Sequence, residues 1–114
     1  MERVEKKEVV WMRIDAERRD NVLYLRLNGE MDEYTAGIAR RDVDRLAETY
    51  ATVSERAVFD LSGLSFMDST GIGFLIGRYK KFKRYGVPVY VTNPSVGTDR
   101  ILEMSGVYTL IPKA

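Results

Sequence analysis

Three small polar residues separate an apolar run from a helical pattern in residues 64–82, LSFMDSTGIGFLIGRYKKF. After Ser69 the apolar side chains recur at spacings of three and four residues, which is typical of an amphipathic helix with one buried face. The polar residues Asp68 to Thr70 suit a helix start, because carboxylates and hydroxyls there accept hydrogen bonds from free backbone N–H groups. An apolar run followed by such a helix favours an α/β fold.

Similar patterns along the chain predict a sheet interleaved with helices. Runs rich in β-branched and aromatic residues predict about five strands, and these lie at residues 9–14, 21–28, 56–61, 87–92 and 107–111. Apolar residues at helical spacing predict three helices, and these lie near residues 35–50, 69–85 and 95–105. The order β-β-α-β-α-β-α-β predicts a mixed, mostly parallel sheet with one antiparallel edge. Polar residues 16–21, 29–34 and 62–68 are expected to form connecting loops.

Length and charge exclude several broad classes of protein. The 114 residues predict one domain, residues 1–114, with a charged N-terminal extension at residues 1–8. The net charge is +1, from 18 basic and 17 acidic residues, so no global field directs the protein to nucleic acid or to membrane. The longest apolar run is far below the roughly 20 residues of a membrane span. We expect a cytoplasmic protein that binds neither membrane nor nucleic acid directly.

The absence of two residue types narrows the possible chemistry. The chain contains no cysteine and no histidine. This excludes zinc sites built from those residues, thiol nucleophiles and imidazole bases. We therefore expect no metal and no cofactor.

Three enzymatic interpretations of the polar turn each lack a required part. Residues 71–77 form GxGxxxG, one residue longer than the dinucleotide fingerprint. Ser69 lacks the GxSxG flanks of a hydrolase nucleophile, and no histidine can take its proton. Asp60 or Asp68 could accept a phosphoryl group as in a receiver domain, but the acidic pair after the first strand is missing. The structural interpretation of the same stretch is that the glycines permit close packing of helix and sheet and that Asp68 or Ser69 caps the helix.

The same stretch also carries a family resemblance. Residues 64–80 (LSFMDSTGIGFLIGRYK), 27–36 (LNGEMDEYTA) and 91–111 (VTNPSVGTDRILEMSGVYTLI) resemble the signatures of anti-sigma factor antagonists, which are single STAS domains of bacteria. The match covers about residues 20–111. It implies the STAS fold, whose order of strands and helices agrees with the order given above.

The resemblance implies a protein–protein switch and not an enzyme. Such proteins bind an anti-sigma factor, usually a serine kinase, and thereby free a sigma factor for transcription. The resemblance implies that the kinase phosphorylates Ser69, with Thr70 as a lesser acceptor, and that a serine phosphatase reverses this. The partner-binding residues that match by position are Glu30, Asp32, Asp68, Ser69, Thr70 and Gly71. The alternative is a STAS scaffold or ligand-binding module of a larger stress-signalling assembly.

Two loops, at residues 29–34 and 64–69, are expected to meet at one edge of the sheet. Both follow strands of the predicted parallel sheet, and the carboxyl ends of such strands gather together. Acidic side chains are therefore expected to form a rim around Ser69, and they are Glu30, Asp32, Glu33 and Asp68. The adjacent helix N-terminus favours an anion.

Other residues of the motif receive structural interpretations. Helical spacing places Tyr79 and Phe82 on the buried stripe, so the basic residues of the segment from Arg78 to Arg84 are expected to be solvated and not to bind nucleic acid. Trp11 is expected to pack in the core or on the sheet. Gly71, in the first turn of the helix, is expected to tolerate a larger side chain without loss of the fold.

Overall fold

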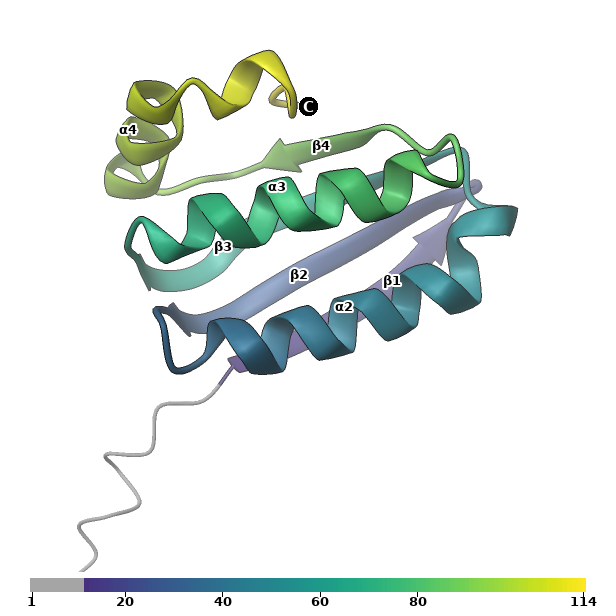
Figure 1. The fold of residues 1–114 in the computed structure, drawn as a ribbon, viewed down its shortest axis with the longest axis horizontal. Helices are drawn as coiled ribbons and strands as arrows, with labels where there is room; N and C mark the ends of the chain where they lie inside the picture. The colour runs from purple at the N-terminus through teal and green to yellow at the C-terminus, as the bar shows by residue number, and fades with distance from the viewer. Residues whose placement is uncertain (1–11) are drawn as a thin grey trace, which may run out of the picture.

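Within residues 12–114, which the computed structural model describes, a four-stranded sheet is the frame of the fold (Figure 1). Its strands are β1 (Met12–Arg19), β2 (Val22–Met31), β3 (Arg56–Met67) and β4 (Val89–Thr92). They lie in the order β1-β2-β3-β4. β1 is antiparallel to β2, whereas β2, β3 and β4 run parallel. The predicted mixed, mostly parallel sheet with an antiparallel edge is confirmed.

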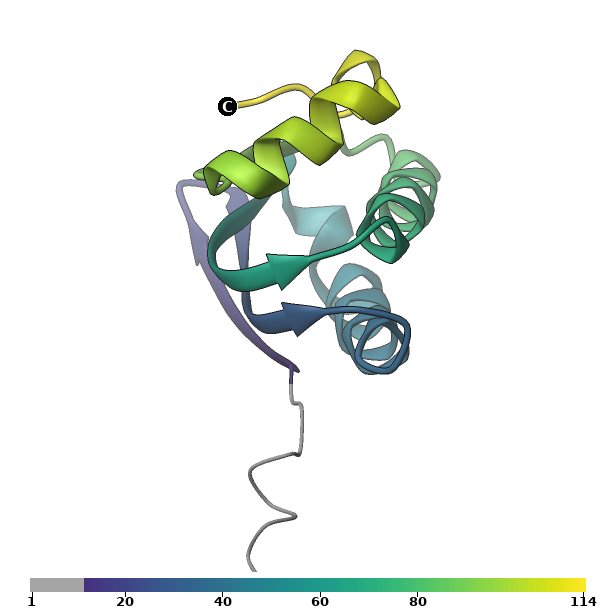
Figure 2. The ribbon, with the colours of Figure 1, turned by 90° about the vertical axis from the view of Figure 1, so that its left-hand side faces the viewer.

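Helices α2 (Ala36–Tyr50) and α3 (Thr70–Lys83) connect the parallel strands, as the sequence predicts, whereas α4 (Val96–Ser105) follows β4, the last strand of the sheet. The short 3-10 helix η1 (Ala51–Val53) follows α2 directly. Figure 2 shows α2 and α3 side by side on one face of the sheet, with α4 beyond the β4 side. The predicted extension at residues 1–8 and the predicted packing of Trp11 concern residues outside the described range.

The first hairpin is tighter than the sequence indicates. β1 continues to Arg19 and β2 begins at Val22, so the turn consists of Asp20 and Asn21. These two residues have φ angles of 53° and 65°. Positive φ at both central residues defines a type I′ hairpin turn, and the short side chains of Asp and Asn tolerate it. The prediction of a loop at residues 16–21 is therefore wrong, because residues 16–19 pair with β2.

β2 and β3 run further than predicted, and this extension positions the candidate site. The ladder pairs Glu30 with Phe66 and Met31 with Met67, after irregularities that shift its register. One irregularity requires Gly63, because a Cβ at that position would lie 2.6 Å from the Leu27 carbonyl oxygen. Residues 62–67, predicted as a loop, are therefore strand, and the irregularities disturb the alternation by which a strand is recognised.

The predicted fifth strand at residues 107–111 is wrong. Val107–Thr109 form a 3-10 helix, η2, directly after Gly106, whose φ of 78° ends α4. The N–H groups of Leu110 and Ile111 both donate to the Val107 carbonyl oxygen at 2.9 Å. This compact turn buries Val107 and Ile111, so its apolar composition is the same as that of a strand. The C-terminal segment meets β4 at the isolated bridge between Val91 and Lys113.

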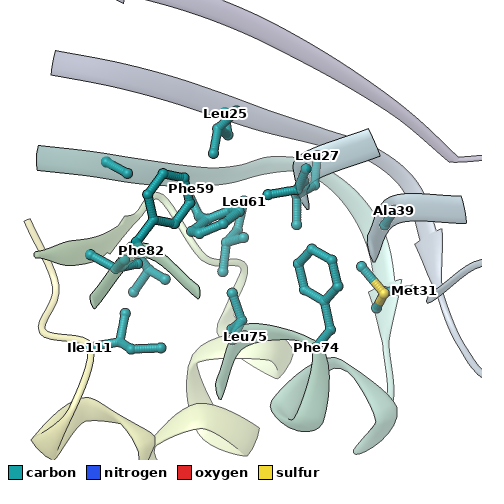
Figure 3. Close-up of a cluster of buried hydrophobic side chains, with 14 of the residues drawn as sticks. Leu25, Leu27, Met31, Ala39, Phe59, Leu61, Phe74, Leu75, Phe82 and Ile111 are labelled. Carbon is teal, nitrogen blue, oxygen red and sulfur yellow. The ribbon is translucent and has the colours of Figure 1, made fainter. Parts of the chain in front are cut away.

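The hydrophobic core lies between the sheet and the pair α2 and α3 (Figure 3). The ring of Phe59 meets Phe74 and Phe82 edge to face, at centroid distances of 6.0 and 6.5 Å. Such pairs each contribute about 0.5–1.5 kcal/mol beyond the area that they bury. The alternation of apolar residues in the strands and their spacing in α3 predict a set of buried side chains, and those at Leu23, Leu25, Leu27, Val58, Leu61, Leu75 and Val89 are buried.

α3 presents a slightly different face to the core than predicted. Ile72, Ile76 and Tyr79 are only partly buried, whereas Phe74 is 5% exposed and Arg78 is 8% exposed. The reason is α2, which packs beside α3 and covers the flank that the spacing assigned to solvent.

Candidate functional site

The chain segments that leave β2 and β3 are joined at the carboxyl ends of these strands. The Asp68 N–H donates to the Met31 carbonyl oxygen at 3.2 Å, one step beyond the last pair of the ladder. This bond places the start of α3 beside the loop that leads into α2. The structure thus brings together the two segments from which the candidate site residues come.

Asp32 organises the start of α2. Its Oδ1 accepts hydrogen bonds from the N–H groups of Tyr34 at 2.9 Å and Thr35 at 3.1 Å. The Thr35 hydroxyl in turn donates to the Glu30 carbonyl oxygen at 2.6 Å and accepts the Asp32 N–H at 3.0 Å. Thr35 is buried, so the hydrogen bonds of its hydroxyl are shielded from water. The loop after β2 is consequently held in one shape, and Asp32 has a structural task at this position.

Asp68, and not Ser69, caps α3. Asp68 Oδ1 accepts the Thr70 N–H at 2.8 Å, and the Asp68 carbonyl oxygen accepts the Gly71 N–H at 3.0 Å. Ser69 occupies the N-cap position, but its side chain makes no capping hydrogen bond. Of the two alternatives that the sequence leaves open, the cap therefore belongs to Asp68. The Ser69 side chain is exposed, and no described residue holds its hydroxyl.

The acidic side chains of the two joined segments differ in their availability. Glu30 and Glu33 are exposed, whereas Asp32 and Asp68 are half-buried. The two aspartates already accept backbone N–H groups. Two glutamates therefore supply the more accessible negative charge in this part of the protein.

A hollow of 250 Å³ lies between the N-terminal halves of α2 and α3. Thr70 contributes to its lining, and the other lining residues are Ala36, Arg40, Gly73, Phe74 and Arg78. Thr70 is half-buried, whereas the neighbouring Ser69 is exposed. Of the two hydroxyls in the motif, that of Ser69 is the more accessible to another protein.

Arg78 is not solvated, so that expectation is wrong. Its Nε lies 2.7 Å from Asp44 Oδ1 of α2, and its Nη1 donates to the Phe74 carbonyl oxygen at 3.4 Å. Burial lowers the pKa of the Arg78 guanidinium, although the adjacent Asp44 opposes this effect. This ion pair ties α2 to α3 behind the candidate site. Its partner lies in a different helix, so spacing along α3 cannot indicate it.

Gly71 is a packing residue, and the expectation that it tolerates a larger side chain is wrong. Gly71 is buried, and a Cβ there would overlap with the side chain of Met67 at the end of β3. The absence of a side chain lets the first turn of α3 approach the strand. Gly73 and Gly77 differ, because a Cβ on either would meet no atom within 4 Å.

Exposed apolar side chains flank the site, and the sequence analysis did not single them out. Tyr34, in the loop before α2, is 79% exposed, and Phe66, opposite Glu30 near the end of β3, is 49% exposed. Large exposed apolar residues beside polar ones mark interaction surfaces. The sequence feature that could have indicated this surface is Phe66, an aromatic residue directly before the buried Met67.

Two further features are absent from residues 12–114. No cluster of three or more acidic side chains in this range could hold a metal ion. None of the helices in this range has the length and apolar character required to cross a membrane.

Comparison with known proteins shows the family. The STAS domain model matches residues 13–113. The anti-sigma F factor antagonist of Paenibacillus polymyxa is 34% identical over 101 residues, which cover 89% of this chain and 85% of that protein. The anti-sigma-B factor antagonist of Bacillus subtilis is 30% identical over 98 residues, which cover 86% of each chain.

Solved structures share the fold. The anti-sigma factor antagonist SpoIIAA in its unphosphorylated form has a TM-score of 0.73 at 22% identity, with 90% of this chain and 88% of that chain covered. The phosphorylated form of SpoIIAA, from Bacillus, has a TM-score of 0.65 at 22% identity, with 90% and 91% covered. The chain therefore belongs to the STAS domain family, among its anti-sigma factor antagonists, which are regulatory binding proteins and not enzymes.

Proposed function

We propose that this protein binds an anti-sigma factor and thereby frees a sigma factor for transcription, and that phosphorylation of Ser69 switches the binding off. The partner would be an anti-sigma factor with serine kinase activity, and a serine phosphatase would restore the active form, all in the cytoplasm. The observation that carries this proposal is the exposed Ser69 hydroxyl, which is left without a structural task because Asp68 caps the helix. Its curated relatives are antagonists of anti-sigma factors.

The surroundings of Ser69 favour it over Thr70 as the acceptor. The Ser69 side chain is exposed at the helix start, whereas Thr70 is half-buried at the rim of the hollow between α2 and α3. A kinase active site must enclose the hydroxyl that it modifies, and an exposed residue at a helix end meets this requirement. Phosphorylation of the related SpoIIAA supports a modified state in this fold.

The proposed binding surface combines apolar and acidic groups. Tyr34 and Phe66 offer exposed aromatic side chains, which are typical anchors of protein–protein interfaces. Glu30 is paired with Phe66 in the ladder, so acidic and aromatic groups are adjacent. Gly71 contributes through its close approach to β3 and not through a contact of its own.

Phosphorylation acts on this surface through charge. A phosphate adds about −1.5 to −2 charges near neutral pH. It would lie beside the capping carboxylate of Asp68 and face a partner that holds nucleotide phosphates of its own. Like charges brought together across an interface cost several kcal/mol. The fold itself should persist, because Ser69 is exposed and makes no capping bond.

The test is phosphorylation by the cognate anti-sigma kinase with ATP, followed by site mapping and affinity measurement. Mass spectrometry should place one phosphate on Ser69. The phosphorylated protein should bind the anti-sigma factor roughly 30- to 700-fold more weakly, which corresponds to about 2–4 kcal/mol. Ser69→Asp should lose part of the affinity, and Ser69→Ala should bind without being modified. Ser62→Ala, at another exposed serine, is the matched control.

Two outcomes would contradict the proposal. A phosphate mapped to Thr70 or elsewhere would reject Ser69 as the acceptor. Equal affinities of the phosphorylated and unphosphorylated forms would reject the switch, even with Ser69 modified.

A further inference from the structure

A second pocket lies beside the end of α3 and the start of β4. Figure 1 shows this junction at the opposite end of α3 from the end that follows β3. The volume of the pocket is 410 Å³, within the range of about 300–1,000 Å³ that is usual for small-molecule sites. Residues from three parts of the chain line it, among them Tyr79, Lys83, Val89, Tyr90, Leu110 and Pro112. We propose that this pocket binds a small organic acid that has an apolar body and one carboxylate. The proposal does not depend on the switch at Ser69.

The walls of the pocket fit an apolar body. Tyr79 and Tyr90 contribute aromatic rings, and Pro112 contributes an aliphatic ring. Leu110 also lines the pocket and is 43% exposed. Aromatic and aliphatic lining with few polar groups is typical of sites for small organic ligands.

Lys83 supplies the charge for a carboxylate. Its ammonium lies 5.6 Å from the centroid of the Tyr79 ring, at the pocket. No acidic side chain lines the pocket. Within residues 12–114, no carboxylate lies within ion-pair distance of Lys83. A negatively charged ligand would therefore meet an uncompensated cation.

The backbone of Val89 supplies a hydrogen-bond donor. Ala57 N–H donates to the Pro88 carbonyl oxygen, and Val91 N–H donates to the Pro112 carbonyl oxygen, each at 3.0 Å. Successive residues of a strand direct their backbone groups to opposite sides, so Val89, like Val91, directs its N–H away from β3. No described residue accepts from this N–H. Val89 is 2% exposed, and a buried N–H without a partner favours a ligand that accepts from it.

The C-terminal segment favours a small ligand over a peptide. Ala114 N–H donates to the Val91 carbonyl oxygen at 2.7 Å, so the chain itself occupies the β4 edge from Val91 onward. Val89 is left as the one open position of β4 between this segment and Pro88, which has no N–H. An added peptide strand needs several consecutive open positions, whereas a carboxylate needs one donor and one cation.

NMR titration of the full chain tests the proposal. The probes are 4-phenylbutyrate and octanoate, and 4-phenylbutan-1-ol is the uncharged control. Both acids should give saturable amide shifts at Val89, Tyr90 and Leu110, with Kd values of about 1 mM or lower, and should leave the Ser69 amide unmoved. The alcohol should bind at least tenfold more weakly, because it lacks the charge.

Variants separate the charge from the walls. Lys83→Gln should weaken binding of the acids about tenfold and leave the alcohol unchanged. Lys80→Gln, at an exposed lysine of α3 that does not line the pocket, is the matched control and should have no effect. Three results would overturn the proposal: no saturable shift with either acid, equal binding of acid and alcohol, or equal effects of the two lysine variants.

Discussion

Asp68 and Ser69 are adjacent, but the structure gives them separate tasks, and substitutions should reveal this. Asp68 Oδ1 accepts the Thr70 N–H at 2.8 Å, whereas the Ser69 side chain makes no such bond. Loss of a capping side chain costs about 0.5–2 kcal/mol. Asp68→Ala should therefore lower the free energy of unfolding by about 1 kcal/mol. Ser69→Ala should change it by less than about 0.5 kcal/mol, as is usual for an exposed residue without a partner.

Asp68→Asn is the matched control for charge. The side-chain oxygen of Asn caps helices about as well as that of Asp, so this variant should keep the stability of the wild type while one negative charge is removed. If Asp68→Asn is as unstable as Asp68→Ala, the interaction of the charge with the helix dipole is what stabilises α3, and the hydrogen bond is not.

The assay is urea unfolding followed by far-UV circular dichroism. With a slope of about 1–3 kcal/mol per M for a small protein, a loss of 1 kcal/mol moves the midpoint by about 0.3–1 M, which is readily measured. A Ser69→Ala variant as unstable as Asp68→Ala would refute the assignment of the cap. It would also remove the argument that the Ser69 hydroxyl is free for modification.

Three further predictions concern packing and pH. Leu75→Ala should lower the free energy of unfolding by about 2–5 kcal/mol in urea titrations, since Leu75 is 1% exposed; a change below about 1 kcal/mol would contradict the buried face of α3. Gly71→Ala should lower the melting temperature, because the new Cβ would overlap with the side chain of Met67. Gly73→Ala should raise the melting temperature, because the space around Gly73 is open and Ala favours a helix more than Gly does. Equal shifts of the two variants would contradict the packing described. A hydrogen bond of 2.6 Å from the Tyr108 hydroxyl holds the pKa of Asp99 below its usual value. This bond should stabilise the protein above the unfolded-state pKa of Asp99 and lose its effect as the pH falls through the lower folded-state pKa, so Asp99→Asn should flatten stability against pH in that acidic window. If the stability of the Asp99→Asn variant depends on acidic pH in the same way as that of the wild type, the hydrogen bond between Tyr108 and Asp99 contributes nothing to stability.

Local signals in the sequence predicted the helix ends best. Ser95 accepts the Thr98 N–H at 3.2 Å, and Gly106 ends α4 with a φ of 78°. Both features depend on residues within one turn of each other, so sequence alone indicates them. The prediction of a strand at residues 107–111 failed because strands and buried turns use the same apolar residue types.

The sequence predicted that the two segments of the candidate site meet, but it did not predict the contacts of their individual side chains. The motif around Ser69 identified the segments, and the parallel order of strands brought them to one edge. The division of tasks between Asp68 and Ser69 depends on the direction of one carboxylate, which spacing does not determine. The burial of Arg78 depends on Asp44, a residue of another helix, and pairings between distant segments leave no periodic signal in a single sequence.

The ties around the candidate site have a consequence for the kinetics of recognition. Buried Thr35 holds the loop before α2, the Asp68 N–H fastens the start of α3 to β2, and the Arg78–Asp44 pair joins the two helices. A surface prepared in this way loses little conformational entropy when a partner docks. Preorganised surfaces change shape little on association, and differences in affinity among variants of one interface arise mostly in the dissociation rate. A modification of such a surface would therefore act chiefly by shortening the lifetime of the complex and less by slowing the encounter.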